Sequence, residues 1–481
     1  MTAGPSADVR VRIAPSPTGY FHVGTARTAL YNWCVARQNG GAFILRIEDT
    51  DRERHQEEQY QGILDALEWL AIPWDEGPYR QSERGPLYAA AVEVLWDAGA
   101  LYACACTREM VEERTRDNPT PGYDGFCRER GLERGPGRAL RFRAPDDGVT
   151  VVHDLVRGEV EFANSTIEDF VVQRSNGEPL FVLAVVADDR EMRISHVIRA
   201  EEHLPTAPKA VLVWEALNRA APESACPLPA FAHLPVLVNA KRQKISKRRD
   251  RVALEDFRAQ GFLPEAIMNY LALLGWSFPG GREFFTREEM VSAFRLEEVT
   301  HSPAFFDEQK MLHFNGVYIR ALSGDEFTGR CRRWAEETGA LPDSLFETQE
   351  WSVLAPLAQE RVAVLSELPG YFDFLADGFS VEADSWAKAV ERDPEAPAIL
   401  KEVRQLAAGL SPFSADGLRQ VLETVAEQHD RRLGKTQAPV RVATLGRTVG
   451  LPLFESLEVL GRDAVLSRLD TALERASRRA G

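Results

Sequence analysis

Some features are scarce in this sequence, and each scarcity excludes a class of protein. Cysteine occurs only six times in 481 residues, which is too few and too scattered for a scaffold held by disulfides. No apolar run approaches the roughly 20 residues that a membrane-spanning helix needs. The first six residues also lack the basic and apolar parts of a signal peptide. We therefore expect a cytoplasmic protein without a membrane segment.

Positive charge is also in deficit. The chain holds 57 Lys and Arg residues against 73 Asp and Glu, a formal net charge of −16. Composition alone therefore does not favour a nucleic-acid partner, and any RNA-binding surface must be local. The chain is long, at 481 residues. Because a single hydrophobic core rarely grows beyond about 250–300 residues, we expect several domains.

The first informative stretch predicts a strand, a loop and a helix. Apolar residues alternate with arginines over residues 9–13, and the prolines and glycine that follow end this strand. Apolar residues at helical spacing then predict a helix over Thr25–Asn39, with two glycines as its stop. Free N–H groups and the helix dipole make such a junction a phosphate-binding geometry.

His22 and Gly24 lie at this junction. A histidine there can donate to a developing phosphate charge, and a glycine lets a flat base approach the backbone. The alternative is a capped helix that carries a histidine by chance.

A second stretch, residues 239–251, is the basic exception in an acidic chain. It holds seven basic residues and one acid around Lys244–Arg248. Taken alone, it would be a solvated basic loop. Taken together, the two stretches resemble the paired HIGH and KMSKS signatures of class I aminoacyl-tRNA synthetases, with His22–Thr25 as the first and Lys244–Arg248 as the second.

Four further motifs narrow the resemblance to the bacterial glutamyl-tRNA synthetases. They follow in order along the chain: Arg12–Gly19, Arg46–Asp51, Tyr79–Arg84 and Val197–Glu202. The resemblance implies a ligase that activates glutamate with ATP and Mg²⁺ and transfers it from glutamyl-adenylate to the 3′ end of tRNA(Glu). It also implies a monomer whose activation step needs bound tRNA.

The resemblance also implies the fold: an α/β, Rossmann-type parallel sheet, split by an α/β insertion and followed by all-α domains. We expect the first half of the nucleotide-binding fold over residues 1–100 and its second half over 181–252. The acceptor-binding insertion would occupy 101–180, a helical stem-contact domain 253–320, and a helical anticodon-binding domain 321–481. Within the insertion, apolar alternation predicts short strands near 140–143, 149–152, 160–162 and 170–173, and Asn176-Gly177 predicts a hairpin turn.

The resemblance assigns a role to each site residue. His22, Lys244 and Lys247 would be catalytic, as donors to the phosphate charge that builds in the transition state. The implied ATP-binding residues are His22, Gly24, Lys244, Ser246, Lys247 and Arg248. The implied glutamate-binding residues are Arg12, Ala14, Ser16, Glu48, Phe181, Val185 and Arg199.

Among these, Arg12 matches the clamp for the side-chain carboxylate, and Arg199 would hold the α-carboxylate. Two guanidinium forks suit two carboxylates, because each pairs with both oxygens at once. Glu48 follows a parallel strand, where ligands of open α/β sheets bind, and would hold the ammonium group.

Two positions depart from the family pattern, which usually has tyrosine at Phe181 and asparagine at Val185. A buried carboxylate that loses two donors should bind more weakly, by roughly 1–3 kcal/mol for each. The departures leave open a paralogue with altered amino-acid or tRNA selectivity. A non-catalytic tRNA-binding protein is a further alternative, but such a protein needs neither ATP signature.

Three of the six cysteines lie close together in the sequence: Cys104, Cys106 and Cys127. In a reducing compartment such a cluster favours a structural zinc site, for which a fourth ligand is needed. Some family members use the tyrosine that matches Tyr123, and others use a histidine where this chain has Glu129. The alternative is three buried free thiols.

Near the C-terminus, residues 431–447 carry five basic residues and no acid. Such a run is usually a solvated face. The family resemblance instead places Arg441 and Leu453 at positions that contact anticodon bases. Unpaired bases are read through edge hydrogen bonds and stacking, so an arginine beside an exposed apolar residue would suit them.

Overall fold

The computed structural model describes residues 9–50, 56–117, 122–245, 252–376 and 378–478. The chain forms two compact units, both discontinuous in sequence. The first unit comprises Met1–Asp256 and Pro264–Glu308, and the second comprises Phe257–Leu263 and Gln309–Gly481. Among the helices of the described residues, none has the length and apolarity to cross a membrane.

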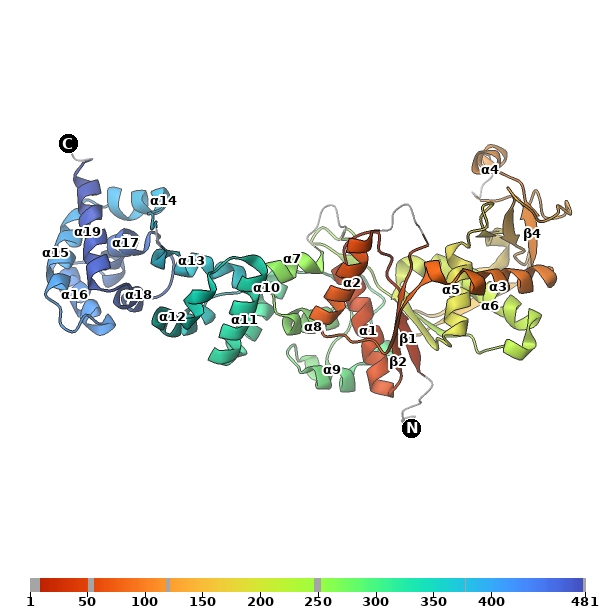
Figure 1. Cartoon of the computed structure of the whole chain (residues 1–481), viewed down its shortest axis with the longest axis horizontal. Helices are drawn as coiled ribbons and strands as arrows, with labels where there is room; N and C mark the ends of the chain where they lie inside the picture. Colours follow the sequence, from red (N-terminus) through yellow and green to blue (C-terminus); the bar gives the residue numbers. More distant parts are fainter. Residues whose placement is uncertain (1–8, 51–55, 118–121, 246–251, 377, 479–481) are drawn as a thin grey trace. The chain divides into compact units, whose positions relative to one another are not determined.

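The first unit begins with a parallel βαβ arrangement (Figure 1). Three parallel strands lie in the order β1 (Arg10–Ile13), β2 (Ala42–Ile47) and β3 (Glu76–Arg80). Helix α1 (Val23–Asn39) connects the first two strands, and α2 (Glu57–Trp69) connects the second and third. The predicted strand, loop and helix are therefore confirmed.

The two glycines after α1 end the helix for different reasons. Gly40 adopts the left-handed conformation at φ 62°, which glycine tolerates best. A Cβ atom on Gly41 would lie 2.0 Å from the carbonyl oxygen of Val9. The chain can therefore turn closely past the start of β1 and enter β2 beside it.

A second sheet adjoins the first. Its order is β7 (Gly158–Ala163), β6 (Val149–Asp154), β10 (Ala230–Leu234) and β9 (His196–Ala200). Strands β9, β10 and β6 are parallel, and β7 is antiparallel to β6. The Ser195 N–H donates to the Arg10 carbonyl at 2.9 Å, so the residue before β9 continues the hydrogen bonding of β1. Helices α5 (Phe181–Glu191) and α6 (Ala207–Ala220) precede β9 and β10, and the α/β fold class is confirmed.

The insertion contains a small antiparallel sheet of β4 (Leu101–Cys104), β5 (Ala139–Phe142) and β8 (Val171–Gln173), with α3 (Gly85–Asp97) before it and α4 (Arg108–Thr115) within it. The predicted turn is present, because Gly177 has φ 88° and the Arg174 N–H donates to Glu178 O at 2.8 Å. The strands predicted near 149–152 and 160–162 are also present, as the antiparallel pair β6–β7. It extends the nucleotide-binding sheet beside β10 and does not join the β4–β5–β8 sheet.

The rest of the first unit is mostly helical. It contains α8 (Pro264–Ala272), α9 (Arg287–Ala293) and the short parallel pair β11 (Leu237–Val238) and β12 (Ala304–Phe305), while α7 (Leu254–Ala259) crosses the boundary between the units. The hydroxyl of Tyr31, on α1, lies 3.0 Å from the carbonyl oxygens of Ala272 and Leu274. The end of α8 is therefore fixed against α1.

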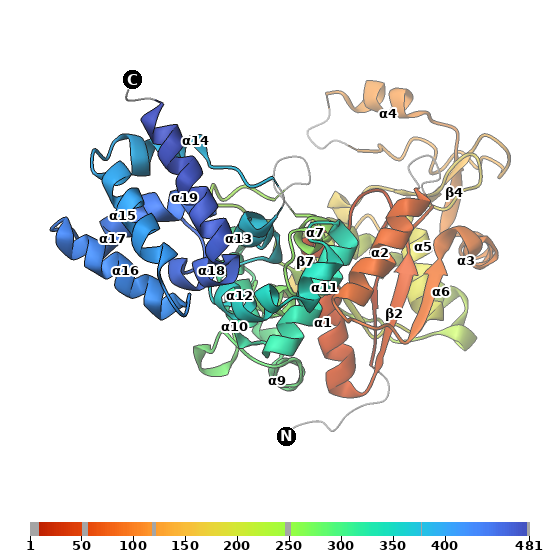
Figure 2. The same cartoon turned by 60° about the vertical axis from the view of Figure 1, so that its left-hand side comes forward.

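The described residues of the second unit are helical and contain no strand. The helices are α10 (Glu308–Ala321, its first residue in the first unit), α11 (Gly324–Thr338), α12 (Gln349–Gln359), α13 (Pro369–Phe372), α14 (Ala383–Trp386), α15 (Ala396–Ala408), α16 (Ala415–Gln428), α17 (Leu433–Leu445), α18 (Leu453–Leu460) and α19 (Arg462–Ser477). Figure 2 shows α15–α19 gathered into one bundle.

Candidate active site

A cavity of about 670 Å³ opens in the first unit at the carboxyl ends of β1, β2 and β9. Ligands of open α/β sheets bind at this edge. Every predicted ATP- and glutamate-site residue that the structure describes lines the cavity: Arg12, Ala14, Ser16, His22, Gly24, Glu48, Phe181, Val185, Arg199 and Lys244. The predicted residues Ser246, Lys247 and Arg248 lie outside the described residues.

His22 is the N-cap of α1. Its Nδ1 accepts hydrogen bonds from the backbone N–H groups of Gly24 at 3.1 Å and Thr25 at 3.3 Å. Since Nδ1 is an acceptor, the neutral imidazole carries its proton on Nε2. This N–H lies 3.2 Å from the Thr25 hydroxyl oxygen, at the positive end of the α1 dipole. A phosphate oxygen that replaced the hydroxyl as its acceptor would suit this position.

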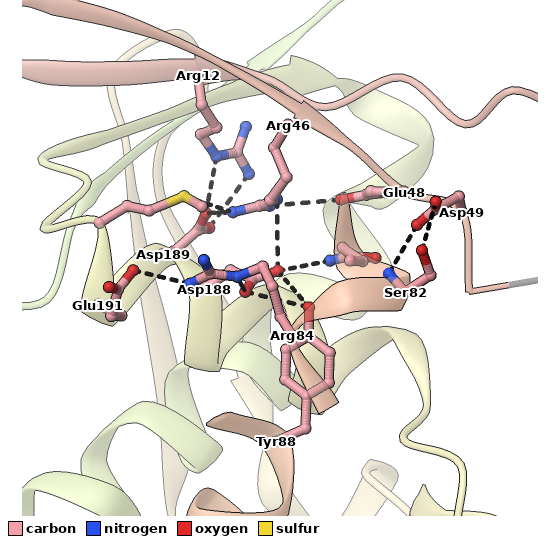
Figure 3. Close-up of polar contacts among 12 residues, drawn as sticks. Arg12, Arg46, Glu48, Asp49, Ser82, Arg84, Tyr88, Asp188, Asp189 and Glu191 are labelled. Carbon is pink, nitrogen blue, oxygen red and sulfur yellow. Dashed lines mark hydrogen bonds and ion pairs between the residues drawn. The ribbon is translucent and has the colours of Figure 1, made fainter. Parts of the chain in front are cut away.

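The Arg12 guanidinium is already engaged on one side. Its Nε and Nη2 donate to the two carboxylate oxygens of Asp189 at 3.1 and 3.3 Å, and both residues are buried (Figure 3). Burial opposes ionisation of Asp189, but the charges of Arg12 and Arg46 outweigh it and hold the pKa of this carboxyl below its ordinary value. Nη1 of Arg12 remains available to a ligand in the cavity.

Arg46 lies behind this pair and is fully buried. Its Nη1 donates to Asp189 at 2.6 Å, its Nη2 lies 3.4 Å from Glu48, and its Nε lies 3.6 Å from Asp188 (Figure 3). Burial disfavours the charge, yet the surrounding carboxylates hold the pKa of Arg46 above its ordinary value. Burial raises the pKa of Glu48, which Arg46 and Arg12 partly offset.

The network continues into the predicted Tyr79–Arg84 motif. The carboxylate of Asp188 accepts from Gln81 at 2.8 Å, from Arg84 Nε at 2.7 Å and from Tyr88 at 2.9 Å (Figure 3). Sequence reasoning assigned no site role to Arg46, Asp188 or Asp189. The sequence did contain a signal for this network, since two consecutive acids stand in the apolar stretch of α5. Buried carboxylates need buried partners, so these two acids predict nearby cations or donors.

The two departures from the family pattern do face the cavity. Phe181 is 37% exposed and stacks on His203 with ring centroids 5.7 Å apart, whereas Val185 is 4% exposed. Both lie on α5, and neither side chain can donate a hydrogen bond. Burial and the nearby Arg199 charge lower the pKa of His203 to about 4, so the ring beside Phe181 is neutral at neutral pH.

At the rim of the cavity, the Lys244 ammonium forms an ion pair with the carboxylate of Glu202. Both side chains are about half exposed. Exposed pairs contribute little and exchange partners readily. Lys244 can therefore turn from Glu202 to a phosphate group.

The cysteine cluster forms in the insertion. The sulfur atoms of Cys104, Cys106 and Cys127 all lie within 4.8 Å of one another. The Tyr123 hydroxyl lies 3.6 Å from the Cys104 sulfur, whereas Glu129 is exposed and pairs with Arg143 at 2.6 Å.

Two guanidinium groups support negative charge on these sulfur atoms. Arg141 Nε lies 3.3 Å from Cys104 and Arg114 Nη2 lies 3.5 Å from Cys106. Burial alone would raise the pKa of the Cys104 thiol, but the Arg141 hydrogen bond helps to bring this pKa below its ordinary value. Burial raises the pKa of Cys106 to about 11.

In the second unit, the predicted anticodon residues are less open than the sequence suggested. Leu453 is only 2% exposed, so the expectation of an exposed apolar residue at this position is wrong. It is the first residue of α18 and packs into the core of the unit. Arg441 donates to the Leu451 carbonyl at 2.7 Å, which fixes the chain just before α18. The exposed apolar side chain nearby is Val449, at 76%.

Comparisons with known proteins agree along the chain. Residues 8–313 match the family model described as tRNA synthetases class I (E and Q), catalytic domain. Residues 326–473 match the model of an anticodon binding domain.

Two curated relatives are similar over their full lengths. The glutamate–tRNA ligase of Thermobifida fusca strain YX is 54% identical, over 97% of this chain and 98% of the relative. That of Frankia casuarinae is 53% identical, over 98% and 99%. Among solved structures, a glutamate tRNA ligase from Elizabethkingia meningosepticum in complex with its amino acid has a TM-score of 0.81 and 29% identity, covering 97% of this chain and 99% of its own.

Proposed function

The chain belongs to the class I tRNA synthetases of the glutamate and glutamine family, and we propose that it is a glutamate–tRNA ligase. The observation that carries this proposal is the single cavity that the described residues of both ATP signatures and of the amino-acid site line together. In this reaction the glutamate α-carboxylate attacks the α-phosphorus of ATP and releases pyrophosphate. A ribose hydroxyl of the terminal tRNA adenosine then attacks the glutamyl-adenylate.

The charges of the cavity favour glutamate over glutamine. Arg12 and Arg199 supply two guanidinium groups and Glu48 supplies one carboxylate. Arg12 lowers the pKa of Glu48, and both residues influence the pKa of Arg199. Glutamate presents the complementary set of two carboxylates and one ammonium group. Glutamine would offer Nη1 of Arg12 a neutral amide oxygen in place of a carboxylate, which should weaken binding by about 1 kcal/mol.

Arg27 also lines the cavity, but both of its terminal nitrogens are already engaged. Both terminal nitrogens donate to backbone carbonyls, of Leu274 at 3.0 Å and of Pro235 at 2.5 Å. We therefore assign no ligand carboxylate to Arg27.

His22 is the residue that we propose to act on the phosphate. Its Nε2–H and the positive end of the α1 dipole would stabilise the oxygens where charge builds in the transition state. Lys244 would join them, and Lys247, Ser246 and Arg248 are proposed from the sequence alone. Mg²⁺ would arrive with ATP and neutralise phosphate charge. Gly24 lets the nucleotide approach the start of the helix.

Pyrophosphate exchange tests this function. ATP–pyrophosphate exchange is measured with glutamate, glutamine, aspartate and the other protein amino acids, each with and without bacterial tRNA. We expect exchange with glutamate and only in the presence of tRNA. Absence of exchange under all conditions would instead support the alternative of a non-catalytic tRNA-binding protein.

A second candidate is a paralogue with altered selectivity. Phe181 and Val185 favour it, because they give the cavity an apolar wall where the family has donors. Exchange with an amino acid other than glutamate, or charging of a tRNA other than tRNA(Glu), would establish this alternative. A variant with Phe181→Tyr and Val185→Asn should then shift the preference towards glutamate.

We also propose that Cys104, Cys106, Cys127 and Tyr123 hold a structural zinc ion. The three sulfur atoms are close enough to share one ion, and the Tyr123 hydroxyl is adjacent. Three thiolates and a phenolate would give the zinc centre a net charge of −2, which Arg114 and Arg141 would offset. Zinc would tie β4 to the loop that carries Tyr123 and Cys127.

The remaining proposals concern tRNA and the cell. We infer that residues 101–180 contact the acceptor end, residues 253–320 the stem, and residues 321–481 the anticodon. Arg441 remains the proposed anticodon contact, and Val449 replaces Leu453 as the exposed apolar neighbour. The protein is proposed to act as a cytoplasmic monomer.

A further inference from the structure

Arg199 is a buried cation that lacks a protein anion. Its residue is 8% exposed, and it takes part in no ion pair within the described part of the chain. Its Nε donates to His233 Nε2 at 3.1 Å and its Nη2 to the His203 carbonyl at 3.3 Å. Burial lowers the pKa of Arg199 to about 10. A buried cation with neutral partners is costly, so an anionic ligand must complete this site.

His233 forms a buried pair with Asp154, and this pair determines which nitrogen of the imidazole carries the proton. His233 Nδ1 lies 2.5 Å from the Asp154 carboxylate, and both side chains are fully buried. The same carboxylate accepts from the N–H groups of Val156 at 3.0 Å and Arg157 at 2.9 Å. A carboxylate surrounded by donors is ionised, so the proton of the imidazole lies on Nδ1 and Nε2 is a bare acceptor.

The ring of Phe231 packs beside both His233 and Arg199. The rings of Phe231 and His233 are stacked at 6.0 Å with an interplanar angle of 6°. The Arg199 guanidinium carbon lies 5.9 Å from the centre of the Phe231 ring. The histidine and the arginine therefore share one apolar support from β10, and their relative orientation is restricted.

We propose that Asp154 and His233 are positioning residues for Arg199 in the binding of the amino-acid α-carboxylate, a proposal that rests on the function proposed above. Asp154 holds His233 as the Nδ1–H tautomer, and the bare Nε2 accepts from Arg199 Nε. The Nε–H and one hydrogen of Nη2 are thereby engaged with protein acceptors. Nη1 and the second hydrogen of Nη2 are left for the carboxylate of the ligand.

The choice of a histidine has an electrostatic reason. A carboxylate in direct contact with Arg199 would cancel its charge and compete with the ligand. A neutral imidazole orients the guanidinium without cancelling it, and the negative charge of Asp154 stays one ring away. Arg12 differs, because its Nε and Nη2 already pair with Asp189 and only Nη1 faces the cavity.

Two amide variants separate positioning from packing. The amide nitrogen of asparagine overlays histidine Nδ1, so His233→Asn keeps the donor to Asp154 but cannot reach Arg199. The amide of glutamine overlays Nε2, so His233→Gln restores an acceptor for Arg199 Nε. We expect His233→Asn to raise KM for glutamate by about tenfold to hundredfold, since hydrogen bonds to charged groups are worth that much. KM for ATP and kcat should change little.

His233→Gln should recover most of the glutamate KM, and this rescue is what a packing role would not produce. Asp154→Asn should act like His233→Asn, because the amide donor forces the His233 proton onto Nε2. Urea unfolding of each variant measures any loss of stability. Equal KM values for the asparagine and glutamine variants, or an unchanged KM in both, would overturn the proposal.

A measurement without turnover separates this proposal from the proposed function. The full chain is labelled with ¹⁵N-histidine, and the His233 signals are assigned by their loss in His233→Gln. At pH 7 we expect a protonated Nδ1 and an unprotonated Nε2. The opposite tautomer would contradict the positioning role even if glutamate exchange is normal, whereas absent exchange with the expected tautomer would contradict only the function.

Discussion

At the scale of single residues, Asp189 is the group on which two arginines converge. Arg12 and Arg46 both contact its carboxylate, and all three side chains are at most 5% exposed. Removing one partner of such a buried pair leaves an uncompensated charge, whereas exposed pairs contribute little. The amino-acid site should therefore depend on Asp189 for its integrity, although Asp189 is not needed to contact the substrate.

Asp189→Asn should lower the free energy of unfolding by about 3 kcal/mol, because the buried Arg12 loses its anion and Arg46 loses the nearest of its three. The matched control is Asp470→Asn, since Asp470 pairs with Arg404 through two similar hydrogen bonds of 2.8 and 3.0 Å but is half exposed. Loss of the Asp470–Arg404 pair should lower the free energy of unfolding by less than about 1 kcal/mol. Urea titration of both variants decides the matter, and equal losses would contradict the importance of the buried network.

The fourth zinc ligand can be identified by substituting single residues. Tyr123→Phe should lower zinc affinity by at least about tenfold, because a four-coordinate site loses one ligand. Glu129→Gln should leave it unchanged, since Glu129 is exposed and paired with Arg143. Zinc retained per chain is measured by elemental analysis after dialysis against a chelator. Cys226→Ser, outside the cysteine cluster, is the control, and loss of zinc only in Glu129→Gln would reverse the assignment.

At the scale of elements, periodicity and stop signals predicted α1 and the strands β5 to β8 to within a few residues. The motifs of the family resemblance then identified the residues that line the cavity. Arg46, Asp188 and His233 were missed because most of their partners are distant in sequence: Arg199 is 34 positions from His233, and Asp189 is 143 positions from Arg46. Such pairing depends on the tertiary fold, and no local pattern reports it. The burial of Leu453 was missed for the same reason.

The start of α1 offers a test in which stability and activity should move apart. A Cβ atom on Gly24 would lie 3.0 Å from Cε1 and Nδ1 of His22, so Gly24→Ala should displace the ring. Displacement of a positioned donor should lower kcat by about tenfold. The melting temperature should change little, because the gain from replacing a helical glycine offsets the weakened His22 N-cap.

The control for this variant is Gly85→Ala at the start of α3, where a Cβ atom would meet no neighbour within 4 Å. Its exchange rate should equal that of the unmodified protein. Full activity of Gly24→Ala would show that the position of the His22 ring does not limit the reaction.

At the scale of the whole molecule, buried titrating groups make stability depend on pH. The pKa of His203 is lowered by burial to about 4, and the paired Asp189 has a pKa below its ordinary value. For both groups the unfolded state binds protons at a higher pH than the folded state. The stability that they provide is therefore present at neutral pH and is lost on acidification.

The free energy of unfolding should begin to fall below about pH 6.5, the ordinary pKa of histidine, and fall further below about pH 4 as the paired carboxylates protonate. Urea unfolding at pH 7, 6, 5 and 4 measures this. His203→Gln should show a shallower loss between pH 6.5 and 4. A stability that rises over this interval would mean that other groups, such as Glu48 with its raised pKa, dominate the titration.

The interleaved sequence of the two units also bears on how the chain is made. Residues 257–263 belong to the second unit, where Leu263 N–H donates to Asn315 Oδ1 at 2.7 Å and Trp334 donates to the Ala259 carbonyl at 2.9 Å. The chain then returns to the first unit for Pro264–Glu308. Since a chain emerges from the ribosome from its N-terminus, these seven residues leave the tunnel before either partner has been synthesised. They must wait for the synthesis of α10 and α11, which follows that of the remaining part of the first unit.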